Sequence, residues 1–446
     1  MSSKFSKIGF ILAVAGSAVG LGNAWKFPTL VGQSGGSAFI LLYIILTLGV
    51  GFVIFLAELS IGKISEKDPV NAYEKLAPSN KKAWSYVGFT MVGAILIVSF
   101  YTLVIGWIVK YVFLSITGNL PMDLEVSKAQ FGFFISEDFL SQFICFTLVF
   151  LCVFYIVSKG VKNGIEKLNV WMMPSLFILL ILMLVYAISK DGFIMAVKFL
   201  FVPDFSKINT SNVLEALGLA FFSLSLGVGT IITYSASLPD KTNFITSTLN
   251  IIFINLLVGL LMGLVVFTFI FEFGYNPNQQ GPGLVFISLA TLFEKIGVIG
   301  CIFGAAFFIS LIFAGITSAV SMIEPLTFYM INNYQISRVK ALFLIGLFVF
   351  VFGICCILSL NLNFFSMFSF FGKDFFTLLD KLTSNFLLPL GAIVCSIFVG
   401  FFMNKKQIYK IFSKFISRKI FLIWLFFIRF ISPIAIILVM CYQIFV

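Results

Sequence analysis

The chain has 446 residues, of which 60% are hydrophobic and 11% are charged, and its mean hydropathy is +1.11. A soluble domain of this length does not carry such a composition, so the sequence predicts a multi-pass membrane protein. The net charge of +11 does not indicate nucleic-acid binding, because the basic residues lie in short loops between apolar segments, where a membrane surface accounts for them.

Eleven apolar stretches are each long enough to cross a bilayer core, which takes ~20 helical residues. They run approximately over residues 8–31, 37–62, 84–117, 138–157, 168–189, 212–236, 242–272, 299–331, 337–360, 378–402 and 419–444. Lysine and arginine are concentrated in the termini and loops that share a side with the N-terminus, which predicts a cytoplasmic N-terminus. The more polar segments 118–137, 190–209 and 274–298 are expected to be outer connections.

The first of these stretches contains Gly16, Gly20 and Gly22 within an uncharged apolar run. Each glycine weakens a helix by ~1 kcal/mol relative to alanine. In lipid, irregular backbone is tolerated where its freed polar groups line a cavity or meet an ion or ligand. We therefore expect a helix that is broken at membrane depth.

The sixth stretch repeats this pattern, since residues 225–229 (SLGVG) echo residues 18–22 (AVGLG). Two interrupted helices at corresponding places in two five-helix halves predict an inverted-repeat transporter with its site at the repeat interface. The repeats would span about 8–189 and 212–402 of a single domain, 1–446, with an extra helix at 419–444. Glycines that merely allow close helix packing are the competing explanation.

Four motifs resemble, in order, the signatures of the neurotransmitter:sodium symporter family in its bacterial amino acid transporter branch. They are residues 16–28 (GSAVGLGNAWKFP), 221–227 (FFSLSLG), 315–319 (GITSA) and 380–385 (DKLTSN). The resemblance covers nearly the whole chain. It implies an all-α integral membrane protein of the LeuT-type 5+5 inverted-repeat fold with broken helices 1 and 6, in the bacterial inner membrane. Its function would be sodium-coupled symport of an apolar or aromatic α-amino acid by alternating access.

The resemblance also implies a substrate site, in which backbone N–H groups and a tyrosine hydroxyl bind the carboxylate and carbonyl oxygens face the ammonium. Its residues would be Ala18, Leu21, Gly22, Ile97, Tyr101, Phe222, Ser223, Ser225, Val228, Ser318 and Met322. Amine transporters of the family carry an aspartate at the position of Gly20. A glycine there leaves the negative charge to the substrate, so an α-amino acid is expected.

Two sodium sites are implied in the same way. The first would comprise Ala18, Asn23, Ser223 and Asn255 together with the substrate carboxylate, and the second Gly16, Val19, Ala314, Thr317 and Ser318. Because the carboxylate completes the shell of one ion, each ligand would raise the affinity of the other. The outer gate would be formed by Lys26, Asp380, Tyr101 and Phe222.

Several positions depart from the family pattern. Lys26 replaces the usual gate arginine and loses its bidentate fork. Leu219 and Gly259 replace polar residues of the family's anion region, so transport is expected not to require chloride. The inner ion pair is missing, since its aspartate is Asn332, and Lys4 or Lys7 would serve instead.

Other functions stay open at this point. An osmolyte or a zwitterion like GABA is the alternative substrate, and a sensor that binds without transporting is the alternative activity. An integral-membrane enzyme is disfavoured, because the sequence has no histidine, no metal-ligating motif and no nucleophile elbow. The seven cysteines lack a CxxC spacing, which argues against a zinc site.

Overall fold

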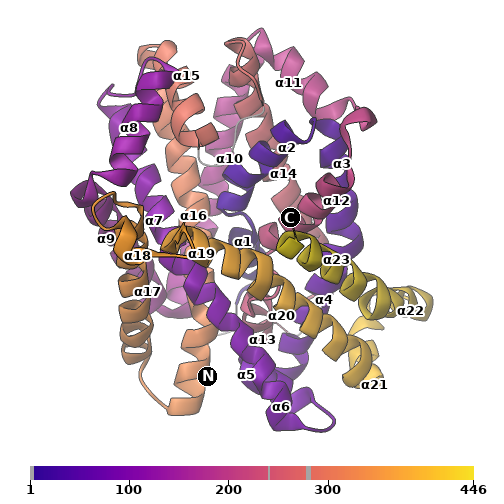
Figure 1. The fold of residues 1–446 in the computed structure, drawn as a ribbon. Coiled ribbons are helices and arrows are strands. Elements are labelled where there is room, and N and C mark those ends of the chain that lie inside the picture. The colour runs from indigo at the N-terminus through magenta and orange to yellow at the C-terminus, as the bar shows by residue number, and fades with distance from the viewer. Residues whose placement is uncertain (1–4, 240–241, 278–282, 446) are drawn as a thin grey trace.

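The computed structural model describes residues 5–239, 242–277 and 283–445. Figure 1 shows a bundle of helices in which α8 (Leu124–Ser136), α11 (Gly192–Phe201) and α15 (Ala290–Lys295) lie at one end. At the other end lie the N-terminus, α5 (Pro69–Leu76), α6 (Lys81–Ser85) and α21 (Lys405–Phe412). In the described residues, the strands β1 (Ser369–Phe370) and β2 (Lys373–Asp374) form one antiparallel pair.

The remaining helices form the body of the bundle. They are α1 (Lys7–Ala18), α2 (Phe27–Gln33), α3 (Ser37–Leu46), α4 (Phe52–Ser65), α7 (Val92–Ile116), α9 (Phe139–Ser158), α10 (Lys167–Ile188), α12 (Thr210–Ser223), α13 (Thr230–Ala236), α14 (Phe244–Glu272), α16 (Val298–Tyr334), α17 (Arg338–Leu360), α18 (Phe365–Phe368), α19 (Phe375–Lys381), α20 (Leu388–Ile397), α22 (Arg418–Phe426) and α23 (Ser432–Phe445). Short 3-10 or π-helical turns join several of them, including the π-helical segments Gly22–Lys26 and Val161–Glu166.

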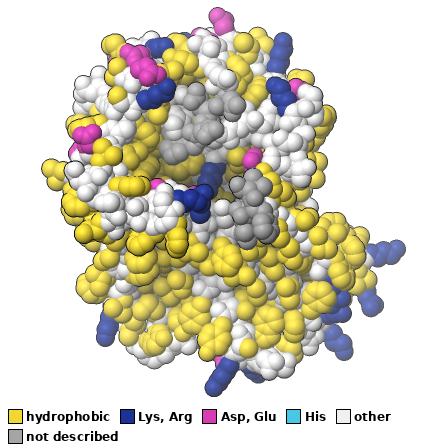
Figure 2. All heavy atoms as spheres, viewed as in Figure 1, with side chains coloured by type: hydrophobic (Ala, Val, Ile, Leu, Met, Phe, Trp, Pro, Cys, Tyr) yellow, Lys and Arg dark blue, Asp and Glu magenta, His cyan; other side chains and the backbone are white. Residues whose placement is uncertain are grey.

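Nine helical stretches of the described residues are long and apolar enough to cross a membrane, and the bent pair Lys7–Ala18 and Gly22–Gln33 makes up to ten. Each of the eleven predicted stretches is helical within a few residues of its expected bounds. The sixth is divided into α12 and α13, neither of which is long enough to cross alone. The count of eleven spans and the cytoplasmic N-terminus remain predictions. Figure 2 shows apolar side chains over much of the visible face, with many lysines and arginines at its lower end.

The long helix α16 packs against α1, α7 and α10. Glu324, on α16, forms an ion pair with Arg338 at the start of α17. Because a carboxylate inside a membrane protein is costly unless it is paired, this contact explains how an acidic residue is tolerated in the bundle. The helix α1 itself packs against α10, α14 and α16, which come from distant parts of the chain.

The sequence named Lys4 and Lys7 as candidates for closing the end of the bundle at which α1 begins. Lys7 is exposed, and Lys4 lies outside the described residues. Phe5 is buried instead, with its ring centroid 5.3 Å from that of Tyr234. Asn332 donates from Nδ2 to Asp68 Oδ2 at 3.3 Å. Phe5 is therefore packed into the bundle just before α1 begins.

Candidate functional site

The first break lies in the backbone after α1. Val19 ends the helix, and the N–H of Gly20 bonds to Ala18 O at 3.0 Å instead of continuing the helical pattern. The chain resumes as a π-helical segment at Gly22, with a bend of 53° between the two parts. A Cβ at Gly22 would lie 2.8 Å from the ring of Phe222, so the absence of a side chain allows this close approach.

The second break separates α12 from α13. Ser225, Gly227 and Gly229 have φ angles of 53°, 84° and 75°, the left-handed region in which an L side chain is strained. Glu58 on α4 accepts the N–H of Gly227 through Oε1 at 2.7 Å. This bond satisfies one of the backbone groups that the break frees at depth in the bundle.

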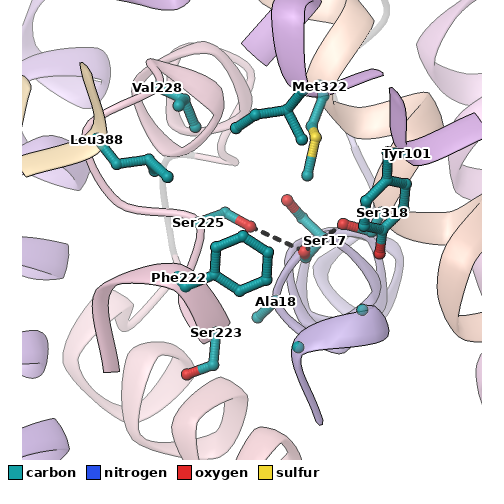
Figure 3. A pocket seen from close by; sticks show the side chains of 13 residues that line it. Ser17, Ala18, Tyr101, Phe222, Ser223, Ser225, Val228, Ser318, Met322 and Leu388 are labelled. Carbon is teal, nitrogen blue, oxygen red and sulfur yellow. Dashed lines mark hydrogen bonds between the residues drawn. The ribbon is translucent and has the colours of Figure 1, made fainter. Parts of the chain in front are cut away.

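Ser17 joins the two breaks (Figure 3). Its carbonyl oxygen accepts the hydroxyls of Ser225 at 2.9 Å and Ser318 at 3.1 Å. Its own hydroxyl bonds to that of Ser321 at 2.8 Å. Sequence reasoning missed Ser17, although a polar residue between two motif glycines, Gly16 and Gly20, was a signal that could have found it. The broken part of α1 is thus tied to both the second break and α16.

A cavity lies between the breaks, and its volume of about 20 Å³ has room for roughly one water molecule. It is lined by Ser17, Ala18, Gly20, Gly22, Ile97, Tyr101, Phe222, Ser223, Ser225, Val228, Ser318, Met322 and Leu388. The predicted substrate residues are all in this set except Leu21. Ser17, Gly20 and Leu388 are additional. Figure 3 shows Phe222 and Met322 among the side chains that surround the space.

The two groups expected to bind a carboxylate are bonded to each other. The N–H of Leu21 donates to the hydroxyl oxygen of Tyr101 at 2.8 Å, and the Leu21 side chain lines a second cavity. A Cβ at Gly20 would lie 2.6 Å from the same hydroxyl. The geometry therefore offers an amide donor and a hydroxyl donor side by side.

Three of the four residues assigned to the first sodium site, Asn23, Ser223 and Asn255, meet in one buried network, and Ala18 lines the small cavity. Asn23 Nδ2 donates to Asn255 Oδ1 at 2.7 Å, and Asn255 Nδ2 donates to Ser223 Oγ at 3.3 Å. Tyr43, which sequence reasoning missed, bonds to Ser223 at 2.9 Å. Asn23 Oδ1 is buried without a hydrogen-bond partner among the described residues. A buried amide oxygen in this condition suits a cation, because burial without a partner is costly.

The residues assigned to the second site come from α16 and the end of α1. Thr317 donates its hydroxyl to Phe313 O at 2.8 Å and Ala314 O at 3.0 Å, which leaves its oxygen able to accept or ligate. A Cβ at Gly16 would lie 3.1 Å from Thr317 Cβ, so α1 and α16 are in close contact there. Val19 caps α1 one turn further on, and Ser318 is bonded to Ser17 as described above.

The four predicted gate residues line a second, larger cavity of about 360 Å³. Lys26 Nζ lies 3.8 Å from Asp380 Oδ1 and 4.0 Å from the centroid of the Phe222 ring. The two charged side chains are 31% and 38% exposed. Tyr101 and Phe222 line both cavities, so they separate the small one from the large one. Figure 2 shows a hollow in the upper half of the molecule.

The region expected to have lost its anion ligands is apolar on one side. Leu219 is buried, and a Cβ at Gly259 would lie 3.6 Å from the ring of Phe27. The neighbouring residues Tyr43, Ser223 and Asn255 belong to the buried network of the first sodium site, where their hydroxyl and amide groups bond to one another. No polar side chain stands at positions 219 or 259 to complete an anion site.

Comparison with known proteins decides the family. The family model described as the sodium:neurotransmitter symporter family matches residues 3–130 and 136–446. The chain belongs to this family. The symporter is 37% identical to the sodium-dependent transporter YhdH of Bacillus subtilis, over 97% of this chain and 96% of that one. It is 33% identical to a sodium-dependent transporter of Haemophilus influenzae, with the same shares covered.

The symporter also matches a solved structure, that of MhsT in complex with L-phenylalanine. The TM-score is 0.89 at 34% identity, and the match covers 99% of this chain and 100% of that one. The all-α LeuT-type fold expected from the sequence is thereby confirmed. The symporter is a multi-pass membrane protein of the cell membrane, a transporter rather than an enzyme, and it couples the transport of a small molecule to sodium.

Proposed function

We propose that the symporter imports an apolar or aromatic α-amino acid together with two sodium ions by alternating access. One observation carries this proposal: the Leu21 N–H, bonded to the Tyr101 hydroxyl, is two residues along the chain from Asn23, whose Oδ1 is buried without a partner among the described residues. A carboxylate accepting from the first two groups would lie where it can also ligate a sodium at Asn23. Binding of each would then favour the other. L-phenylalanine is the amino acid found in MhsT.

The remaining assignments extend this proposal. Carbonyl oxygens of Ala18, Phe222 and Ser223 and the Ser225 hydroxyl would receive the ammonium. Gly16, Val19, Ala314, Thr317 and Ser318 would hold the second sodium. Residues 8–189 and 212–402 would be the two repeats that move against each other, with the site between their broken helices.

An amino acid side chain is larger than the cavity of about 20 Å³. The space is bounded by Phe222 and Met322, and methionine readily changes rotamer to fill or clear irregular space. We therefore infer that binding requires Phe222 and Met322 to repack. Because the Lys26 ammonium lies over the Phe222 ring, movement of Phe222 would also displace Lys26. Opening of the site and loosening of the outer gate would then occur together.

Uptake into proteoliposomes tests the function. A panel of labelled phenylalanine, leucine, tryptophan, tyrosine, GABA and glycine betaine is offered under inward sodium, potassium or proton gradients. An apolar amino acid should accumulate only with sodium, and Thr317→Ala should reduce this uptake at least about tenfold, since a cation ligand is lost. Thr117→Ala is the control, because its exposed hydroxyl bonds only locally, to Phe113 O and Leu114 O of α7 and to Asn119 Nδ2 just beyond the helix. Accumulation of GABA or betaine alone would refute the amino acid assignment, and binding without accumulation would indicate a sensor.

Replacement of chloride by gluconate tests the anion assignment. Uptake should change by less than about twofold, because positions 219 and 259 supply no anion donors. Initial rates of sodium-driven uptake are measured at matched ionic strength and sodium concentration. A steep fall on removing chloride would show that Tyr43 and its neighbours suffice for a chloride site.

A further inference from the structure

A groove between α9 and α17 has no part in the transport site. The two helices pack against each other, and α17 lies on the left side of the molecule in Figure 1. The groove has a volume of about 460 Å³ and shares no lining residue with the two cavities described above. Thr147 and Ser158 are the two polar residues among those that line it, and none of its lining residues is charged. Such a lining suits an apolar ligand.

The groove opens on the side of the bundle that faces lipid. Leu151, Phe343 and Leu347 line it and are 57%, 69% and 55% exposed. Both helices are long and apolar enough to cross a membrane, so exposed side chains in their middle turns face acyl chains. A Cβ at Gly346 would lie 3.3 Å from the rings of Phe150 and Phe154. The absence of a side chain therefore lets both rings lie against the backbone of α17 along the groove.

The length of the groove matches half of a bilayer core. One end lies at Ser158, the last residue of α9, and at Val339, the second residue of α17. The other end lies at Thr147 and Phe350, eleven residues away along each helix. Eleven residues at the helical rise of 1.5 Å span ~16 Å, and a hydrocarbon core is ~30 Å thick. The groove therefore has room for an acyl chain of one leaflet, from the helix ends to the middle of the core.

Two lysines stand at the end of the groove where the helices begin and end. Arg338 Nε donates to Val157 O at 2.8 Å, so the end of α9 meets the start of α17. Arg338 itself is paired with Glu324. Lys159 and Lys340 each directly follow a lining residue, and both are exposed. Neither forms an ion pair with a carboxylate of the described residues. Basic groups at the mouth of a pocket between membrane helices suit the headgroup of an anionic lipid.

We propose that the groove between α9 and α17 binds an acyl chain of an anionic phospholipid, whose phosphate is held by Lys159 and Lys340. A free phosphate would leave the apolar groove unfilled, and an uncharged lipid would leave the two lysines without a counter-ion. The bound lipid would contact both helices, at the place where Arg338 already joins them. Since the lipid binds the folded protein, it should stabilise the bundle.

Thermal unfolding of the purified protein in detergent tests the headgroup. The added lipid is palmitoyl-oleoyl phosphatidylglycerol, or phosphatidylcholine with the same acyl chains. Phosphatidylglycerol should raise the melting temperature roughly 3–5 °C more than phosphatidylcholine does. Lys159→Gln combined with Lys340→Gln should weaken phosphatidylglycerol binding about tenfold, to the level of phosphatidylcholine. Lys405→Gln combined with Lys406→Gln is the control, because it makes the same change of charge on α21 and should alter binding less than about twofold.

A second pair of variants tests the groove itself. Leu151→Phe combined with Leu347→Phe fills it, and should weaken binding of both lipids at least about fivefold because the acyl chain loses its space. Leu148→Phe combined with Leu344→Phe is the control, since these leucines are exposed on the same two helices and do not line the groove. Retained phosphatidylglycerol, counted by native mass spectrometry, gives a readout that does not depend on unfolding.

Four results would overturn the lipid site. They are equal stabilisation by the two lipids, unchanged phosphatidylglycerol binding without the two groove lysines, an equal loss in the lysine control on α21, or unchanged lipid binding when the groove is filled. The substituted side chains are exposed, so the variants are expected to fold. None of these measurements requires transport, so failure of the proposed function would leave their outcome unaffected.

Discussion

Asn23→Ala is expected to reduce sodium-driven uptake about a hundredfold or more. The substitution removes two donor contacts to Asn255 and the unpartnered Oδ1 together. It also leaves the Asn255 amide oxygen without its donor in a buried site. Losses of ~1–2 kcal/mol for each such group add to a factor of this size. Binding of both sodium and substrate should be weakened, because the substrate carboxylate is proposed to ligate the same sodium ion as Asn23.

The measurement is uptake as a function of sodium concentration, together with the sodium-dependent shift of the melting temperature in detergent. Asn212→Ala is the matched control, a buried asparagine whose Nδ2 bonds to Ser34 Oγ at 2.8 Å outside the network of Asn23. Asn212 completes the capping box of α12 by accepting the N–H of Asn209, so its loss should lower stability and leave the sodium concentration for half-maximal uptake unchanged. A near-normal sodium response in folded Asn23→Ala protein would contradict the first site.

Gly227→Ala is expected to abolish transport and to lower the yield of folded protein. The residue has a φ of 84°, which costs an alanine roughly 1–2 kcal/mol. In addition, the new Cβ would lie 2.1 Å from Leu388 O, a backbone atom that moves only if α20 moves. The displaced backbone would also weaken the bond from the Gly227 N–H to Glu58. The break between α12 and α13 therefore could not keep its shape.

Gly118→Ala isolates the effect of φ alone. This glycine has a φ of 66°, and the nearest atom to its added Cβ is Cys301 Sγ at 3.9 Å. It should lose only the conformational cost and retain uptake. Yield of monodisperse protein, melting temperature and initial uptake rate are compared for the two variants. If Gly227→Ala behaved like Gly118→Ala, the close approach of α20 to the break would have no functional importance.

The spans were predictable from the sequence because hydrophobic length is a local property. The breaks were predictable for the same reason, since glycine clusters are visible without knowing their neighbours. The helices α8, α11 and α15 were missed because they lie in more polar connections that lack a membrane-length apolar run. Burial of Phe5 was missed as well, because it depends on Tyr234, which is far away in the sequence.

Most of the substrate cavity followed from the motifs. The motifs did not predict Tyr43, Ser17 or Leu388, because each of these residues reaches the site through a contact between distant segments. Tyr43 is on α3 and meets Ser223 on α12, a pairing that no local pattern indicates. The carbonyl of Ser17 acts through the backbone, which side-chain identity does not reveal. The sodium and substrate roles themselves remain proposals that the uptake experiments test.

The strength of the contact between Lys26 and Asp380 should depend on the salt concentration. It is a single approach at 3.8 Å between side chains that are each about one third exposed, so dissolved ions reach it. The Debye length, beyond which the interaction between two exposed charges is largely screened, falls from ~10 Å in 0.1 M salt to ~3 Å in 1 M salt. Sodium is the ion that drives the symporter, and at high concentration it also screens this pair. High sodium concentration would therefore weaken the contact between Lys26 and Asp380 through ionic strength.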